Sequence, residues 1–223
     1  MKFDERGLEV INRVVEEKGE EAIPDLLSLM EKNEDDSELI LMITESISRM
    51  GAGSRNYLVR YLKDKRRRFN AAPRQYKEEA FRTTLLVVID LMGETGTHED
   101  IDLIEGFLGL FDEEKAHLII YEAIAKLGGG LKYIDLLELM AFEDDFTEEI
   151  IGQVIMTLSY IDDARALFDL LKTTRFDWLD ANQKIMVERG LKRLLSFHKD
   201  FYELLERDPY GKKVLKSILE SEK

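Results

Sequence analysis

The sequence contains no cysteine, three prolines, three histidines and one tryptophan among its 223 residues. The absence of cysteine excludes disulfides, thiolate metal sites and cysteine nucleophiles. No apolar run reaches the roughly 18 residues that a membrane-spanning helix needs. The charged stretch Met1–Arg6 lacks the apolar core of a signal peptide. We therefore expect a cytoplasmic protein that makes no use of a membrane.

Asparagine and glutamine are also scarce, with five and three copies, whereas charged residues make up 35% of the chain. This balance is in the direction that thermophile proteins take. Hydrophobic residues make up 44%, which is enough for a chain of this length to bury a core. The composition indicates a folded, acidic protein.

The net charge of −14 is unevenly distributed. Residues 55–82 hold ten Lys or Arg against three carboxylates, a local balance of +7, which leaves −21 on the rest of the chain (−14 − 7). An acidic surface repels nucleic acid and anionic membrane at long range. The basic segment is therefore the one region where an anionic partner is expected.

Nearly the whole chain has the hydrophobic pattern of helices, and no strand-like alternation persists between turn signals. A first helix is predicted near 4–18 and a last one near 209–221. The other predicted helices alternate between two types, called A and B here. The A-type helices lie near 21–32, 54–68, 98–111, 131–143, 163–173 and 199–207, and the B-type helices near 37–50, 76–92, 113–127, 147–161 and 178–196.

Turn and cap signals support these boundaries. Thr97 with Asp100, and Asp145 with Glu148, have the spacing of a capping box, and Asp208-Pro209 is typical of a helix start. Three B-type helices are followed by a glycine where a left-handed C-terminal residue is expected. These glycines are Gly51, Gly93 and Gly128.

One phrase of the sequence nearly repeats. Residues 23–30, IPDLLSLM, return as residues 133–140, YIDLLELM. The offset of 110 residues is about three units of roughly 37, a length typical of two-helix solenoid repeats. B-type helices are apolar on more than one face, as expected for helices that pack between neighbours. Together these features predict an all-α, right-handed α-solenoid.

The A-type phrase Ala22–Leu27 with its proline, and the B-type ending Glu122–Gly128, resemble HEAT and HEAT-like (armadillo-type) repeats. The resemblance extends over roughly residues 20–207. It implies about five helix pairs, with capping helices at 1–19 and 208–223, in a single domain of residues 1–223. It also implies a non-enzymatic scaffold or adaptor for protein partners, monomeric or weakly self-associating.

One repeat is longer than its neighbours, because residues 69–75 are inserted between two helices, next to a run of basic residues. Insertions in repeats often map to binding faces. The basic residues here are candidates for binding an acidic protein segment, phosphate or nucleic acid, with a solvated helix end as the alternative. The candidate residues are Lys63, Lys65, Arg66, Arg67, Arg68, Arg74 and Lys77.

No other motif indicates catalysis, and we expect no cofactor and no metal. The histidines are isolated, and the single His98-Glu99 pair does not match the iron-binding set of the HEAT-like deoxyhypusine hydroxylases. Trp178 is interpreted as a packing residue beside Phe176. Asp90, inside an apolar helix, is interpreted as capping a neighbouring helix or pairing with an arginine such as Arg82 or Arg55.

The function that these patterns favour is a protein–protein interaction scaffold with a basic inserted segment, residues 55–82. The alternative is a nucleic-acid-binding or DNA-repair protein of the HEAT-like alkylpurine DNA glycosylase type, in which a carboxylate such as Asp90 would be catalytic. Reversing the charge of Arg66, Arg67 and Arg68 is expected to abolish binding without unfolding the protein. The partner's identity is not encoded in a recognisable motif.

Overall fold

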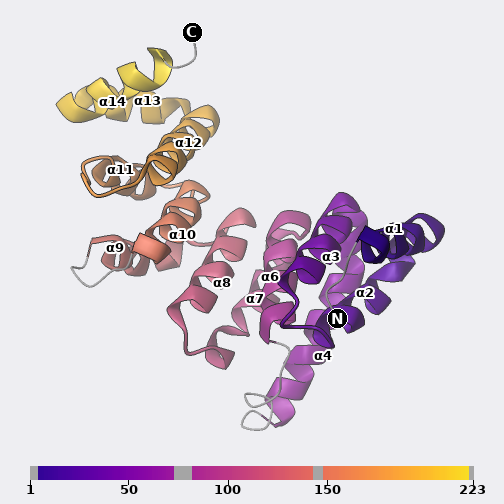
Figure 1. Ribbon diagram of the computed structural model, residues 1–223. Coiled ribbons are helices and arrows are strands. Elements are labelled where there is room, and N and C mark those ends of the chain that lie inside the picture. The colour runs from indigo at the N-terminus through magenta and orange to yellow at the C-terminus, as the bar shows by residue number, and fades with distance from the viewer. Residues whose placement is uncertain (1–4, 73–81, 143–147, 221–223) are drawn as a thin grey trace. The chain divides into compact units, whose positions relative to one another are not determined.

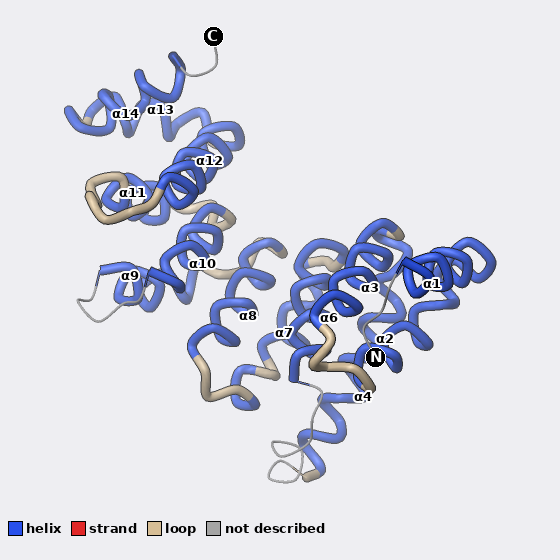
Figure 2. Tube along the Cα trace, in the orientation of Figure 1, coloured by secondary structure: helices blue, strands red, loops and turns tan. Residues whose placement is uncertain are grey.

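The computed structural model describes residues 5–72, 82–142 and 148–220 (Figure 1). Within these residues every regular element is a helix, and Figure 2 shows helices and loops with no strand among them. The predicted all-α class is therefore confirmed. The chain divides into two compact units, Met1–Leu127 (unit 1) and Gly128–Lys223 (unit 2). Each unit is described by itself.

Unit 1 begins with α1, Glu5–Lys18, and its helices then follow in two sets. The first set contains α2 (Ile23–Glu31), α4 (Arg55–Ala71) and α7 (Ile101–Glu105). The second set contains α3 (Ser37–Arg49), α6 (Arg82–Thr95) and α8 (Glu114–Lys126).

The two sets form two layers in unit 1. Helix α4 contacts both α2 and α7 in one layer, and α6 contacts both α3 and α8 in the other. Contacts of α2 with α3, α4 with α6 and α7 with α8 join the layers. The core lies between them and is built from fully buried side chains such as Ile43, Leu62, Ile89 and Ile124. Helix α4 therefore has one buried face and two flanks that face its neighbours in the layer.

Unit 2 contains α9 (Ile134–Phe142), α10 (Glu148–Ser159), α11 (Ala164–Thr173), α12 (Ala181–Phe197), α13 (Lys199–Arg207) and α14 (Pro209–Glu220). Helix α9 contacts α11, and α10 contacts α12, so alternate helices pack side by side as they do in unit 1. Helix α13 contacts both α12 and α14.

The three glycines that were predicted to end helices differ in their backbone conformation. Gly51 and Gly128 adopt φ values of 58° and 83°, as predicted for residues that follow a helix in the left-handed region. The prediction for Gly93 is wrong, because α6 continues through it to Thr95. A Cβ atom at Gly93 would lie 2.8 Å from the Cα atom of Ala123 on α8. Gly93 therefore permits a close approach of two helices and does not end one.

The predicted helix over 98–111 is mostly replaced by shorter pieces. It consists of a 3₁₀ turn at His98–Asp100, the five-residue α7, and a second 3₁₀ turn at Leu108–Leu110. Gly106 and Gly109 lower the helix propensity of this stretch. The fully buried side chain of Phe107 supplies the packing that a longer helix would have supplied.

The cap predictions have mixed outcomes. The capping box of Thr97 and Asp100 is present, and Asp208 accepts a hydrogen bond from the backbone N–H of Gly211 at the start of α14. Asp145 lies outside the described residues. A further capping box joins Asp180 and Gln183, so α12 begins after Asp180 and Trp178 lies in the turn before it.

Candidate functional site

The basic run lies on α4, and the helical repeat distributes it over two flanks. Residues that follow one another at intervals of three and four share a helix face. One such set faces α2 and lines one hollow, and another faces α7 and lines a second hollow. The basic cluster is therefore two groups of side chains and not one patch.

The first hollow, called the α2–α4 groove here, has a volume of about 360 Å³. It is lined from α2 by Pro24, Leu27, Ser28 and Glu31, and from α4 by Tyr57, Arg60, Tyr61, Asp64, Lys65 and Arg68. Three of its lining residues are cations and two are carboxylates. The groove thus combines positive charge with aromatic and apolar surface.

Lys65 forms the floor of the α2–α4 groove. Its ammonium Nζ lies 2.5 Å from the carboxylate of Glu31, and the side chain is only 5% exposed. The hydroxyl of Tyr61 donates to Oε1 of Glu31 at 2.7 Å, and the Lys65 ammonium lies 5.0 Å from the centre of the Tyr61 ring. Lys65 was a candidate for anion binding, but its charge is already used to join α4 to α2.

Arg60 and Arg68 form the upper rim of the groove, with Asp64 between them. Asp64 accepts from Arg67 at 2.7 Å and from Nε of Arg68 at 2.9 Å, so two arginines share one carboxylate. Arg60 is exposed and has no acidic partner among the residues that the structure describes. Both rim arginines therefore retain N–H donors that can be directed at a ligand.

The second hollow, called the α4–α7 hollow, has a volume of about 520 Å³. It is lined by Lys63, Arg66, Arg67, Asn70, Glu99, Asp102 and Leu103. Nη1 of Arg66 donates to the backbone carbonyl of Asp102 at 2.9 Å, in the first turn of α7. This carbonyl also accepts from the backbone N–H of Gly106. Arg66 therefore joins α4 to α7, and Lys63 is an exposed cation on this side.

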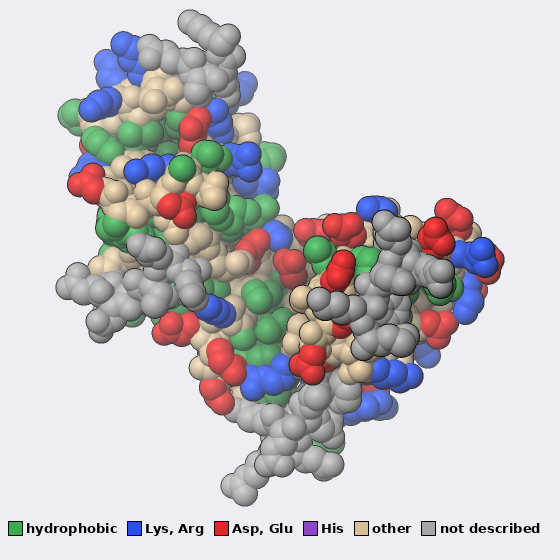
Figure 3. Space-filling model, viewed as in Figure 1, with side chains coloured by type: hydrophobic (Ala, Val, Ile, Leu, Met, Phe, Trp, Pro, Cys, Tyr) green, Lys and Arg blue, Asp and Glu red, His purple; other side chains and the backbone are tan. Residues whose placement is uncertain are grey.

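The remaining two candidates, Arg74 and Lys77, lie outside the described residues. Arg60 was not singled out from the sequence, although it shares a face with Asp64 and Arg68 at intervals of four. That spacing is the signal that could have identified it. On the face of unit 1 seen in Figure 3, basic side chains gather near the region of α4.

The first residue of α4 has a structural role. The Arg55 guanidinium binds the carboxylate of Asp100 through Nε at 2.7 Å and Nη2 at 3.0 Å, and Asp100 also accepts from the backbone N–H of Thr97. Burial raises the pKa of Asp100, but the hydrogen bonds from Arg55 and Thr97 outweigh it, so the pKa lies below its ordinary value. The hydrogen bond to Asp100 raises the pKa of Arg55.

The acidic residues at the end of α2 and in the turn after it supply partners for several helices. Glu31 binds Lys65 and Tyr61, as described above. Glu34 accepts from the backbone N–H groups of Thr83 and Thr84, at 3.2 and 2.9 Å. These groups lie in the first turn of α6, so Glu34 caps a helix that is distant in the sequence. Asp36 caps α3 through the backbone N–H of Leu39.

Asp90 does not pair with Arg82 or Arg55, so that prediction is wrong. Its carboxylate lies 3.1 Å from Nζ of Lys126 on α8, and its side chain is 44% exposed. The buried carboxylate of this region is Glu122, which binds Lys126 at 2.9 Å. Burial raises the pKa of Glu122. Burial lowers the pKa of Lys126, but the carboxylates of Asp90 and Glu122 outweigh this effect, so the pKa lies above its ordinary value. Lys126 is therefore a fixed cation between α6 and α8.

His117 and Trp178, which were weighed as functional residues, also make structural contacts. Nε2 of His117 lies 2.8 Å from the carbonyl of Phe111 and 3.1 Å from that of Leu108. Trp178 is 45% exposed and stacks on Phe176 with ring centres 5.1 Å apart. Among the described residues, no group of three or more His, Asp or Glu side chains is arranged to hold a metal ion.

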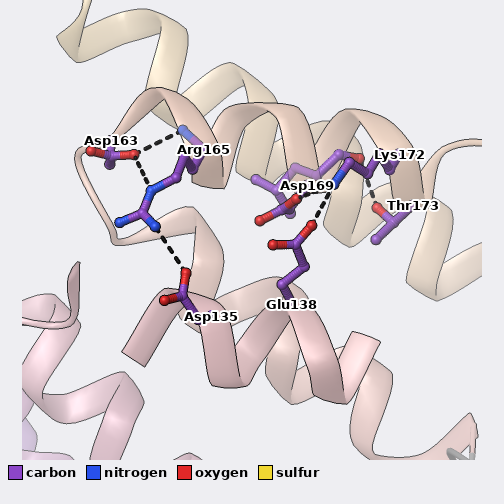
Figure 4. A network of polar contacts seen from close by, with 8 residues as sticks. Asp135, Glu138, Asp163, Arg165, Asp169, Lys172 and Thr173 are labelled. Carbon is purple, nitrogen blue, oxygen red and sulfur yellow. Dashed lines mark hydrogen bonds and ion pairs between the residues drawn. The ribbon is translucent and has the colours of Figure 1, made fainter. Parts of the chain in front are cut away.

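Unit 2 contains a polar network between α9 and α11 (Figure 4). Arg165 donates to Asp135 at 2.9 Å and to Asp163 at 3.4 Å, and Lys172 donates to Glu138 at 2.6 Å and to Asp169 at 2.9 Å. Burial raises the pKa of Asp169, although Lys172 opposes the shift. Here each of the two cations is matched by carboxylates.

Comparison of the chain with family models, with curated proteins and with solved structures finds no match. Among the described helices, none has the length and apolar character that are needed to cross a bilayer. The functional assignment therefore rests on the geometry of the two hollows beside α4.

Proposed function

We propose that this protein is a non-enzymatic interaction scaffold whose basic segment, residues 55–82, binds an acidic segment of a protein partner. One observation carries the proposal. Arg60 and Lys63 are exposed without an acidic partner among the described residues, while Arg67 and Arg68 share Asp64. This local excess of positive charge belongs to a chain whose net charge is −14. An acidic partner would satisfy it.

We further propose that the helix pairs are HEAT-like repeats and that the chain is a right-handed α-solenoid. The side-by-side contacts of alternate helices within each unit support this proposal. So does a recurring local feature, because α2, α4, α7 and α9 each follow directly on a 3₁₀ turn. These turns are Gly19–Ala22, Gly51–Ser54, His98–Asp100 and Leu131–Tyr133. Stacked helix pairs present long surfaces that suit partner binding.

The test compares two charge-reversal variants in binding a fluorescent oligoglutamate peptide. The first variant reverses Arg60, Lys63 and Arg68 to Glu and leaves Lys65 and Arg66, which hold α4 to its neighbours. The control reverses Lys184, Lys199 and Lys213, which are exposed in unit 2, so both variants have the same net charge. We expect binding at about 50 mM salt to be lost only in the first variant and to fall as salt is added.

Equal binding by both variants would contradict the proposal. The same titration with a single-stranded oligonucleotide tests the alternative of a nucleic-acid-binding protein. The affinity of such a protein for the oligonucleotide would fall steeply with salt. Tighter binding of the oligonucleotide than of the peptide would replace the proposed acidic protein partner with nucleic acid. Circular dichroism of both variants checks that the helices remain folded.

A further inference from the structure

The α2–α4 groove has a charge pattern that alternates along α4. Arg60, Asp64 and Arg68 follow one another at intervals of four on the same face. The two arginines are eight residues apart, which corresponds to about 12 Å along a helix. A ligand that binds both therefore needs two anionic groups at a comparable separation.

Asp64 places a negative charge between the two arginines. Its carboxylate is held in place at the centre of the rim by Arg67 and Arg68. A third anionic group opposite Asp64 would be repelled. The middle of the ligand is therefore uncharged.

The surface beneath the rim is apolar and aromatic. Pro24 and Leu27 of α2 and the rings of Tyr57 and Tyr61 of α4 line the same groove. The Lys65–Glu31 ion pair with its Tyr61 hydrogen bond fixes the floor, because these groups join the two helices. An apolar side chain placed between two anionic ones would contact this surface and remove it from water.

We infer that the α2–α4 groove binds an extended acidic peptide segment with carboxylates at positions i and i+4 and an apolar side chain at i+2. This inference rests on the proposed function and specifies the site and the chemistry of the partner. In an extended chain, residues i, i+2 and i+4 lie on one face, and i and i+4 are about 13 Å apart. That separation matches the spacing of Arg60 and Arg68.

The α4–α7 hollow fits this segment less well. Arg66 already donates to the carbonyl of Asp102, and Glu99 and Asp102 line the hollow together with Lys63. A nucleic-acid strand fits the groove less well too, because it carries a phosphate at every nucleotide and would place one near Asp64. The alternating charge of the rim thus selects for spacing and not for total negative charge.

The experiment measures the fluorescence anisotropy of three labelled peptides with the full chain. The first is Gly-Ser-Glu-Ser-Leu-Ser-Glu-Ser-Gly, in which the carboxylates have the inferred spacing. The second, Gly-Ser-Glu-Glu-Leu-Ser-Ser-Ser-Gly, has the same composition with adjacent carboxylates. The third has Glu in place of the central Leu. We expect the first to bind at least about fivefold more tightly than either of the others.

Single substitutions then assign the binding to side chains. Arg60→Gln and Arg68→Gln are each expected to weaken the binding of the first peptide about fivefold, the range for an exposed charge pair. Lys63→Gln, on the opposite flank of α4, is expected to change the affinity for this peptide less than twofold. Arg49→Gln, an exposed arginine of α3, is the control for loss of one charge. Asp64→Asn is expected to remove the penalty on the third peptide.

Equal affinity for the first two peptides, or an equal loss in Lys63→Gln and Arg60→Gln, would overturn the inference. The oligoglutamate titration separates this failure from that of the proposed function. If oligoglutamate still binds through α4 while the spacing has no effect, the scaffold proposal stands and the groove assignment falls. If neither oligoglutamate nor the spaced peptide binds, both are wrong.

Discussion

Helices α4 and α11 belong to different units, and both use polar side chains to reach the preceding helix of their layer. On α11, Arg165 and Lys172 bind carboxylates of α9 that lie 30 and 34 residues earlier. On α4, Tyr61 and Lys65 bind Glu31 of α2, and the separation of Tyr61 from Glu31 is again 30 residues. The two units therefore repeat one way of joining neighbouring helices.

The two helices differ in what remains after these contacts are made. The cations of α11 named above are matched by carboxylates, whereas α4 has Arg60 and Lys63 exposed and has two arginines on Asp64. An ion pair and a hydrogen bond to Glu31 join α4 to α2. The additional cations of α4 are not needed for that contact, which is why we assign them to a ligand.

The largest expected effect concerns the polar contact between neighbouring helices, a type of contact that occurs within each unit. Lys65→Ala removes the cation from a buried pair and leaves Glu31 with Tyr61 alone. We expect the free energy of unfolding to fall by about 3 kcal/mol, because an uncompensated buried charge is costly. Urea denaturation followed by circular dichroism measures this loss. Lys63→Ala on the same helix is the control, and a loss of similar size there would contradict the distinction between buried and exposed cations.

The second effect compares glycines of the two units. A Cβ atom at Gly93 of α6 would lie 2.8 Å from the Cα atom of Ala123, whereas at Gly152 of α10 the nearest atom is the methyl group of Met186 at 3.6 Å. Gly93→Ala is expected to cost about 2 kcal/mol through overpacking. Gly152→Ala is expected to stabilise α10 by up to about 1 kcal/mol. Thermal denaturation of both variants measures the difference, and equal midpoints would refute it.

The third effect is a pH dependence in unit 1. The pKa of Asp100 is lowered, so its contribution to stability is present above the ordinary value of 3.8 and is lost as the pH falls through the lowered value. Asp100→Asn is expected to cost about 2 kcal/mol at neutral pH, because Arg55 loses its ionised partner. The difference between the variant and the original chain should vanish in acid. A difference that persists below that range would show that charge is not its cause.

The smallest expected effect separates paired from unpaired surface cations. Lys172→Gln on α11 removes two ion pairs and is expected to cost about 1 kcal/mol, reduced by half or more at high salt. Arg60→Gln on α4 is expected to change stability by less than about 0.5 kcal/mol. The two variants are measured side by side at low and high salt. A larger loss in Arg60→Gln would mean that this arginine has a structural role.

The helices could be predicted from the sequence because their patterns are local. The hydrophobic period and the caps at Thr97 and Asp208 place helix ends within a few residues of those observed. Gly93 was misinterpreted because the same residue serves a left-handed helix end and a close helix contact. Only the position of Ala123 distinguishes the two, and that position is a property of the packed chain.

The basic cluster could be located from the sequence, but its division between the two flanks of α4 could not be predicted. A run of charges is visible in one dimension, whereas the partners of Lys65 and Arg66 come from α2 and α7, more than 30 residues away in each direction. The periodicity of α4 could have placed Arg60 with Arg68. Which flank would be filled by carboxylates depends on tertiary contacts, and so does the burial of Glu122 in place of Asp90.

The carboxylate of Glu34 has a consequence for how this sequence can vary. It binds the first turn of α6, so the start of that helix is held by the turn between α2 and α3 and not only by the chain that arrives from α4. The first turn of α6 is thus held by a residue that lies about 50 positions earlier in the sequence. A substitution that removes the Glu34 carboxylate would therefore act at a distance along the chain, because it would leave two N–H groups at the start of α6 without their acceptor.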